Sequence, residues 1–173
     1  DKSIKVLYGG KSFDFDLLKG SENELGINIK DLRSKTGLIT LDPGYKNSGS
    51  CTSDITFLDG EKGVLKYRGY SIEDLANKAD FLEVAYLLIF GELPSKIHLE
   101  KLKNNINEES IVDEDLKVIL KSFPKSAHPM GVLASLTSAL TAFNPSAVDI
   151  NSEEDMFEAI VMLLGKFPIL TSW

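Results

Sequence analysis

The sequence has a single cysteine, Cys51, and only two histidines among its 173 residues. Because Cys51 has no second cysteine in the chain, an intrachain disulfide and a cysteine-based zinc site are both excluded, and a reducing compartment fits. No apolar run is long enough to span a bilayer, and no signal-peptide pattern is present. These absences lead us to expect a cytoplasmic protein that has no membrane partner.

Positive charge is also in deficit, with 19 Lys and Arg against 26 Asp and Glu and a formal net charge of −7. The lysines are scattered rather than aligned in a stripe, which argues against nucleic acid as a partner. Gly60 and Gly63 do not form a phosphate-binding loop, because the spacing and the following Lys-Ser or Lys-Thr are missing. With 43% hydrophobic residues, the chain can bury the core of one domain plus a small appendage.

The stretch from Ile55 to Ala76 predicts a β-hairpin that leads into a helix. Alternating apolar residues flank a turn at residues 59–63, where both glycines are able to take a positive φ. After it, the Ser71 side chain is placed to accept a hydrogen bond from the backbone N–H of Asp74, which is favoured there by the helix dipole. The helix is therefore predicted to begin at Ile72.

The preceding residues predict a small antiparallel sheet. Residues 4–16 alternate on both sides of Gly9-Gly10, a pattern typical of a hairpin with a two-residue turn. Between residues 25 and 41 the pattern favours a helical turn at 30–34 and a further strand just before Asp42. A stretch rich in Asn, Ser, Gly and Thr then predicts a loop at 45–53.

Beyond Asp80 the hydrophobic period changes from two to nearly four, which predicts at least five helices with short connections. Asp80 and Glu83 form a capping box, and Gly91 ends that helix. The later helices are predicted to begin at Ser95, about Asp113, Pro129 and Ser152. We therefore expect a mainly α fold: a β appendage with its linker at residues 1–53, and a bundle-like helical domain at residues 54–173.

The helix after Pro129 carries a stripe of small residues that includes Gly131, Ser138 and Ala142. Small side chains allow backbones to approach closely, so this helix is predicted to be central and buried. The last helix is too apolar to face water on more than one narrow side. Because the sequence stops at Trp173 without a polar ending, we expect a helical domain truncated at its C-terminus.

Three strings resemble the citrate synthase family in the same order: ITFLDGxxGVLxYRGYSIEDLA from Ile55, FLEVAYLLIFGELP from Phe81, and His-Pro-Met from His128. The resemblance covers nearly the whole chain, and the N-terminal extension is similar to that of the bacterial hexameric branch. It implies the N-terminal portion of an acyltransferase of the tricarboxylic acid cycle, which condenses oxaloacetate with acetyl-CoA to give citrate and CoA.

That chemistry needs a base beside a weakly acidic methyl group and donors to the two carbonyl oxygens. The family's catalytic histidines, aspartate and arginines lie downstream of the portion resembled here. The resemblance therefore implies no catalytic, cofactor-binding or metal-binding residue in this chain and an inactive fragment that binds no cofactor. For the full-length enzyme it implies acetyl-CoA as co-substrate, contacts between this portion and the rest of its own chain, and a homodimer or hexamer.

The residues that could carry chemistry each have a structural interpretation. His98 is expected to be a solvated residue near the start of a helix, and His128 a hydrogen-bonded histidine at a helix start. For Arg68 two interpretations remain: an anion ligand, or a buried arginine that ties the hairpin to the helical body, which we favour. The carboxylate clusters are interpreted as solvated helix ends, at Glu73-Asp74, Glu108-Glu109 and Glu153-Glu154-Asp155.

The hexameric branch commonly carries an NADH-binding regulatory site, from which this chain departs. Glu108-Glu109 stands where that branch has an Arg-His pair, Asn144 replaces a tyrosine, and Met162 replaces an arginine. Only Lys166 is retained. Because adjacent carboxylates repel a pyrophosphate, the resemblance predicts a full-length enzyme that NADH does not inhibit.

Two alternatives stay open. A 2-methylcitrate synthase shares the same strings but uses propionyl-CoA, and the determinants of that choice lie outside this chain. A non-enzymatic helical module would instead bind a protein partner through the small-residue helix and the apolar C-terminus. A reading frame that stops after Trp173 would favour the module.

Overall fold

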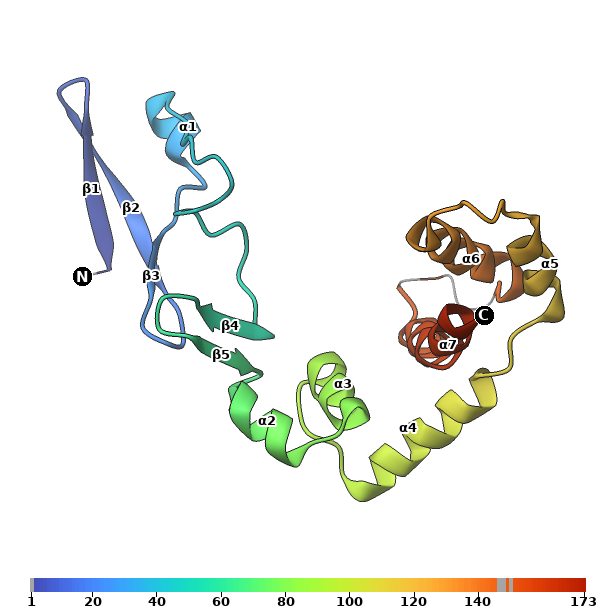
Figure 1. The fold of residues 1–173 in the computed structure, drawn as a ribbon. Helices are drawn as coiled ribbons and strands as arrows, with labels where there is room; N and C mark the ends of the chain where they lie inside the picture. The colour runs from blue at the N-terminus through green and yellow to red at the C-terminus, as the bar shows by residue number, and fades with distance from the viewer. Residues whose placement is uncertain (1, 146–148, 150) are drawn as a thin grey trace. The chain divides into compact units, whose positions relative to one another are not determined.

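A computed structural model describes residues 2–145, 149 and 151–173 (Figure 1). The chain divides into two compact units, residues 1–54 and 55–173. Two three-stranded antiparallel sheets and seven helices make up the described residues, so the predicted mainly α fold with a small antiparallel β appendage is confirmed. None of the described helices combines the length and the apolarity needed to cross a bilayer.

The first unit is a three-stranded sheet with one short helix. Strands β1 (Ser3–Tyr8) and β2 (Lys11–Lys19) pair antiparallel, and the left-handed Gly9 and Gly10 form the predicted two-residue turn. Strand β3 (Leu25–Ile27) pairs with β2. The buried Phe15 packs beneath the Lys35 ammonium of α1 (Leu32–Thr36), which lies 5.3 Å from the ring centroid.

The strand predicted just before Asp42 is wrong, since residues 38–41 are not in a strand. A turn between Gly20 and Glu24, closed by the Gly20 N–H bond to the Glu24 carbonyl, returns the chain onto β2 much earlier. Residues 25–27 therefore take the place beside β2. The apolar alternation at Ile39 and Leu41 finds no neighbouring strand, and both side chains are exposed.

The second unit begins with the predicted hairpin of β4 (Thr56–Asp59) and β5 (Val64–Tyr67), to which β6 (Tyr70–Ser71) is added. The Asp59 carboxylate accepts hydrogen bonds from the backbone N–H of Glu61 and Lys62 and from the Lys62 ammonium, which organises the turn. Of the two turn glycines, only Gly63 takes a positive φ.

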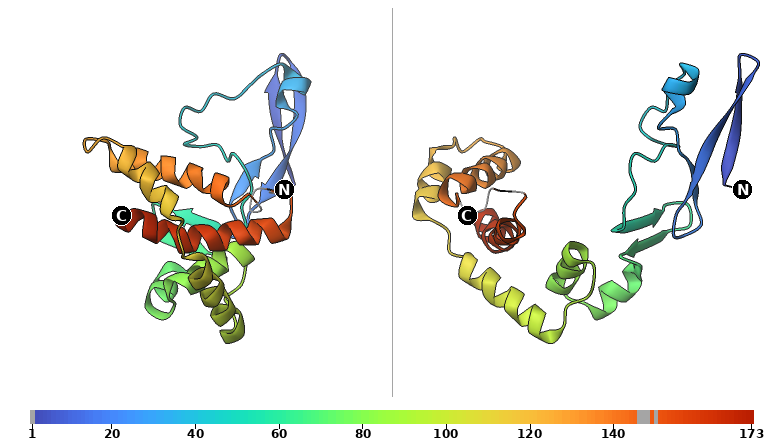
Figure 2. Two further views of the ribbon diagram at one scale, coloured as in Figure 1. Left: turned by 90° about the vertical axis from the view of Figure 1, so that its right-hand side faces the viewer. Right: turned by 180° about the vertical axis from the view of Figure 1, so that it is seen from behind.

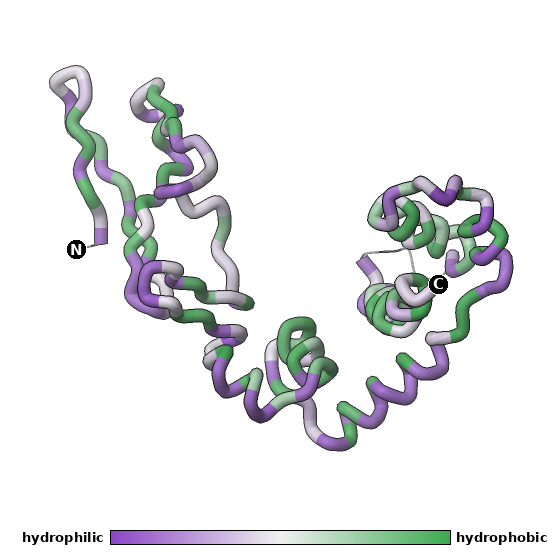
Figure 3. The backbone as a smooth tube through the Cα atoms, in the orientation of Figure 1, coloured by the Kyte–Doolittle hydropathy of each residue, from purple (hydrophilic) through white to green (hydrophobic). Residues whose placement is uncertain are grey.

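Six helices follow: α2 (Ile72–Lys78), α3 (Phe81–Phe90), α4 (Lys96–Glu109), α5 (Glu114–Ser122), α6 (Pro129–Phe143) and α7 (Glu153–Ser172). Each begins after a residue whose side chain accepts a backbone N–H bond of the first turn. Around α3 the capping box is complete, with Asp80 accepting from the Glu83 N–H at 2.8 Å and Glu83 accepting from the Asp80 N–H at 2.7 Å. The predicted helix starts are thus confirmed. Figure 3 shows α4 as mostly hydrophilic, in contrast to α3.

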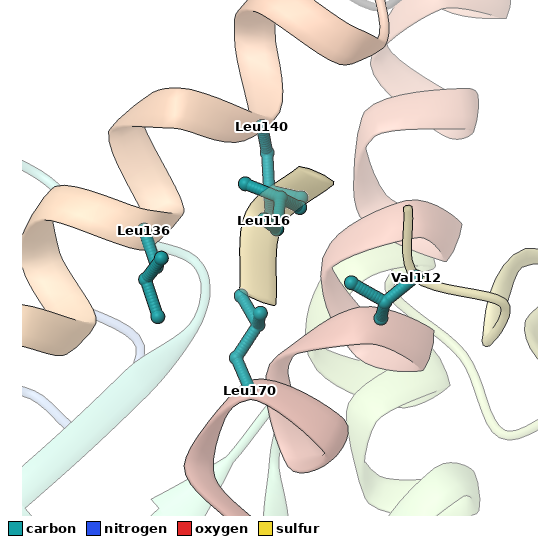
Figure 4. Packing of buried hydrophobic residues seen from close by; sticks show 5 residues of the cluster. All are labelled: Val112, Leu116, Leu136, Leu140 and Leu170. Carbon is teal, nitrogen blue, oxygen red and sulfur yellow. The ribbon is translucent and has the colours of Figure 1, made fainter. Parts of the chain in front are cut away.

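A leucine-rich core joins α5, α6 and α7, which contact one another along the chain's C-terminal part (Figures 1 and 2). Its buried members are Val112, Leu116, Leu136, Leu140 and Leu170 (Figure 4). Leu116, Leu136 and Leu140 are each at most 1% exposed.

The prediction that α6 is a central, buried helix is wrong for this chain on its small-residue side. Its leucine face packs into the core, whereas Gly131, Ser138 and Ala142 are exposed. The small-residue stripe therefore lies away from α5 and α7, whose contacts are made by the larger side chains. On α7 the exposed apolar residues Met156, Leu163 and Phe167 fall at helical spacing on one stripe, as predicted.

Candidate functional site

The residues that depart from the regulatory pattern gather at one pocket of about 310 Å³ between α4 and α7. The pocket is lined by Asn105, Glu108, Glu109, Asn144, Phe157, Glu158, Val161 and Met162. A larger hollow of about 500 Å³ lies along α4. The described residues that line it all belong to that helix, so they form one wall of a surface hollow and no second element faces them.

The close approach of α4 and α7 depends on Gly165. A Cβ atom at this position would lie 2.8 Å from the Ile106 carbonyl oxygen, and 3.1 Å from both the Glu109 carbonyl carbon and the Ser110 nitrogen. These are backbone atoms, which cannot rotate away as a side chain does. Glycine is therefore the residue that allows the last turn of α4 to rest on α7.

Beside Gly165, the Lys166 ammonium ties the two helices together. Lys166 is only 6% exposed, and its Nζ donates to both the Glu109 backbone carbonyl and Glu109 Oε2, each at 2.8 Å. Glu109 is the last residue of α4, where a cation also interacts favourably with the helix dipole. The positive charge of Lys166 is thereby compensated within the protein by the Glu109 carboxylate.

The pocket itself carries negative charge on one side and an apolar surface on the other. Glu108, Glu109 and Glu158 supply carboxylates, and Phe157, Val161 and Met162 supply apolar surface. Lys166 is paired to Glu109, and the described residues that line the pocket include no lysine or arginine. The pocket is chemically unsuited to a phosphate group, because like charges repel and no cation compensates them.

Sequence reasoning had pointed to four of these positions, Glu108, Glu109, Asn144 and Met162, and missed Asn105, Phe157, Glu158 and Val161. Phe157 and Val161 stand four residues apart on α7, as do Glu158 and Met162, so helical spacing does place them on adjoining rows. That spacing does not say which other helix they face. Asn144 ends α6, where its side-chain amide donates to the Leu140 carbonyl at 2.9 Å.

Arg68 ties the hairpin to α3, which is the interpretation we favoured. Its guanidinium Nη2 donates to the Leu88 carbonyl at 3.0 Å, and its backbone N–H donates to the Ile55 carbonyl at 2.7 Å. Arg68 therefore connects the start of β4, the end of β5 and the last turn of α3.

Neither histidine lines the pocket. His98 is exposed in the first turn of α4, and its Nδ1 lies 3.3 Å from the Tyr86 hydroxyl, with the two rings stacked. His128 precedes α6, and its Nδ1 accepts the Met130 N–H at 3.2 Å, as a capping residue does. Within residues 2–145, 149 and 151–173, no cluster of His, Cys, Asp and Glu side chains could hold a metal ion.

The remaining carboxylate clusters lie in the first turns of α2 and α7, where they were predicted. At α2, the hydrogen bond from the Lys78 ammonium, followed by that from the Ser71 hydroxyl, lowers the pKa of Asp74 below its ordinary value. In the hairpin, Lys62 in the same way lowers the pKa of Asp59. Both carboxylates are therefore held in the ionised form, which suits a structural role.

The matches to curated relatives extend over the whole chain. A family model described as "Citrate synthase, C-terminal domain" matches residues 44–173. The citrate synthase of Corynebacterium glutamicum is 42% identical over 174 residues, covering 100% of this chain and 40% of that protein. Citrate synthase 1 of Mycobacterium tuberculosis is 38% identical over 173 residues with the same coverage. The chain thus spans about two fifths of the length of these curated relatives.

Solved structures agree on the fold. Citrate synthase from Thermotoga maritima is 30% identical with a TM-score of 0.64, covering 78% of this chain and 34% of its own. The Pyrobaculum aerophilum enzyme is 24% identical with a TM-score of 0.61, covering 98% of this chain and 39% of its own. The enzyme of Thermoplasma acidophilum, solved as a ternary complex with carboxymethyl coenzyme A and oxaloacetate, is 20% identical with a TM-score of 0.66, covering 76% of this chain and 35% of its own. The last two likenesses concern the fold alone.

Proposed function

The chain belongs to the citrate synthase family, and on that premise we propose that it is the N-terminal portion of an enzyme that condenses oxaloacetate with acetyl-CoA to give citrate and CoA. The observation that carries this proposal is 42% identity along the whole chain to a protein of that name. The three strings from Ile55, Phe81 and His128 add to it. We place this portion at the start of the full-length protein because its β appendage resembles the family's N-terminal extension.

The chain contributes scaffold to the reaction. Deprotonating an acetyl methyl group needs a base next to it and a donor to the thioester oxygen. In this chain His128 Nδ1 is occupied by the Met130 N–H, and His98 Nδ1 faces Tyr86. The family resemblance implies that the base, the carbonyl-polarising histidines and the substrate-binding arginines belong to the rest of the enzyme, and the contacts of the two histidines fit this. Residues 1–173 alone bind no cofactor and do not turn over, whereas the full-length enzyme takes acetyl-CoA as its co-substrate.

The test uses the full-length protein, with CoA release from acetyl-CoA followed by a thiol reagent. Release that depends on oxaloacetate, and a product identified as citrate by mass spectrometry, is the expected result. Propionyl-CoA serves as the competing substrate, and a higher kcat/KM for it would replace this proposal by a 2-methylcitrate synthase. No thiol release from either thioester would refute the enzymatic proposal altogether. Residues 1–173 serve as the matched inactive control.

We also propose that the full-length enzyme is cytoplasmic and assembles as a homodimer or hexamer. The exposed small-residue face of α6 supports assembly, because such a face allows close contact between backbones. The lone Cys51 fits a reducing compartment. Light scattering after gel filtration measures the assembly, and a monomeric full-length protein would contradict it.

For regulation, we propose that NADH does not inhibit the full-length enzyme. Support comes from the pocket between α4 and α7, where Glu108, Glu109 and Glu158 present carboxylates and Lys166 is already paired. Initial rates are expected to stay unchanged as NADH is raised to millimolar concentration at low ionic strength, where charge effects are least screened. Inhibition at sub-millimolar NADH would overturn this.

A further inference from the structure

Arg68 occupies a position that is unfavourable for an arginine backbone. Because Tyr67 pairs with Tyr70, Arg68 and Gly69 are the two central residues of a tight turn, and their φ values are 48° and 90°. Turns with a positive φ at both central residues favour Asn-Gly or Gly-Gly. A residue with a long side chain in the left-handed region is strained there, and such strain persists where the side chain has a task.

One part of that task is visible at the end of α3. The last turn of α3 contains no basic residue of its own, and the guanidinium of Arg68 donates to the Leu88 carbonyl in that turn. The charge thus lies next to the negative end of the helix dipole, where a cation is stabilising.

The guanidinium keeps an unused donor. Arg68 Nε is buried and has no hydrogen-bond partner, the one side-chain nitrogen or oxygen in that condition among the described residues. No carboxylate in the described part of the chain forms an ion pair with Arg68. Buried polar groups are nearly always bonded, and a buried charge is nearly always paired.

We propose that Arg68 Nε donates to a carboxylate in the part of the full-length protein that this chain does not contain, so that Arg68 joins the hairpin, α3 and that part. The inference rests on the proposed function in one respect, namely that the full-length protein has the length of its relatives, of which this chain covers 40%. A carboxylate is the partner because the guanidinium carries a full charge and its present acceptor, the Leu88 carbonyl, is neutral.

Thermal unfolding of the full-length protein tests the proposal, first through Arg68→Asn, which removes every hydrogen bond of the guanidinium. Asparagine relieves the backbone strain, which offsets the loss of the bond to the Leu88 carbonyl, so Tm stays close to that of the wild type if this bond is the only one the guanidinium makes. We expect Tm to fall instead. Arg68→Lys keeps the charge and a donor for Leu88 but has no Nε, and we expect it to lower Tm by about 2 °C or more. Arg33→Lys, at the chain's other arginine and exposed on α1, is the matched control and should leave Tm unchanged.

A Tm for Arg68→Lys equal to that of the wild type would overturn the proposal, as would an unchanged or raised Tm for Arg68→Asn. A crystal structure of the full-length protein gives the direct answer: a carboxylate oxygen within 3.5 Å of Nε supports the proposal, and water or no acceptor there overturns it. Condensation activity is measured separately on the wild type. A protein without activity would refute the proposed function. The measurements on Arg68 would still decide whether its Nε donates to a carboxylate in the rest of the protein.

Discussion

Replacing Gly165 by alanine tests how α4 and α7 are held together. The new Cβ would lie 2.8 Å from the Ile106 carbonyl oxygen and 3.1 Å from backbone atoms of Glu109 and Ser110. Carbon atoms do not approach a carbonyl oxygen this closely, so the last turn of α4 has to move. That movement also pulls Glu109 away from the buried Lys166 ammonium.

Two opposing terms set the magnitude. Alanine is favoured over glycine within a helix by about 1 kcal/mol. Overpacking a close contact costs roughly 1–3 kcal/mol, and three backbone contacts at or below 3.1 Å place Gly165→Ala at the upper end. We therefore expect a net loss of about 1–2 kcal/mol in the free energy of unfolding, and a fall of about 0.5–1 M in the urea midpoint.

Urea unfolding of residues 1–173 can be followed by the fluorescence of Trp173, the chain's only tryptophan. Trp173 ends α7, and the Lys117 ammonium of α5 lies 4.7 Å from its ring centroid, so unfolding of this region changes its surroundings. Gly131→Ala is the matched control, because its Cβ meets no atom within 4 Å and the residue is exposed in α6. It should raise stability by up to about 1 kcal/mol. Equal, stabilising shifts for both variants would refute the packing account.

Glu109→Gln should lower the free energy of unfolding by about 1–2 kcal/mol, because it leaves the Lys166 ammonium buried without its carboxylate. The exposure of Glu109 limits the effect. In a double-mutant cycle with Lys166→Met, additive effects of the two substitutions would contradict the ion pair. Asp80→Ala should lower the free energy of unfolding by about 1 kcal/mol, because α3 loses its N-terminal cap. Asp80→Asn keeps an acceptor and should be close to the wild type in stability. Similar losses for both variants would exclude capping as the cause. Because Lys78 lowers the pKa of Asp74 below its ordinary value of 3.8, the ionised carboxylate stabilises the fold above that pH, and this stabilisation is lost as the pH falls through the folded-state pKa. Unfolding curves at pH 5 and pH 3 should accordingly show a smaller pH effect for Asp74→Asn than for wild type, and an equal effect would show that Asp74 is not linked to folding.

Helix boundaries were predictable because caps are local. The Ser71 and Asp80 side chains each accept a bond from the third residue after them, so the whole interaction lies within one short string of sequence. Nothing distant needs to be known. The same holds for the Gly9-Gly10 turn, whose left-handed residues are dictated by the turn itself.

Strand pairing was less predictable because alternation says which face a residue takes and nothing about its neighbour. The apolar Ile39 and Leu41 alternate with Thr40, yet the chain pairs residues 25–27 with β2, since the turn that begins at Gly20 brings them there first. The third strand of the second sheet, β6, is only two residues long and gives no pattern to detect.

The pocket between α4 and α7 depends on contacts over long sequence separations. Glu109 and Lys166 are 57 residues apart, and each, taken alone, looks like an ordinary surface residue of a helix. The family resemblance pointed to both positions, but as two separate positions of a nucleotide site, Glu109 as a replacement that repels the pyrophosphate and Lys166 as a retained residue. The hydrogen bonds between them form because the last turn of α4 packs against α7, an arrangement that the sequence does not show.

Glycine in a helix illustrates the same limit most sharply. A glycine among other small residues in α6 predicted a close backbone approach there, yet Gly131 has open space around it. The close approach occurs at Gly165, which stands between the larger Leu164 and Lys166 and attracts no notice in the sequence. Both glycines carry the same propensity cost of about 1 kcal/mol, so propensity cannot tell them apart. Only the atoms opposite each Cβ position do so, and the opposite signs expected for the two alanine substitutions measure that difference directly.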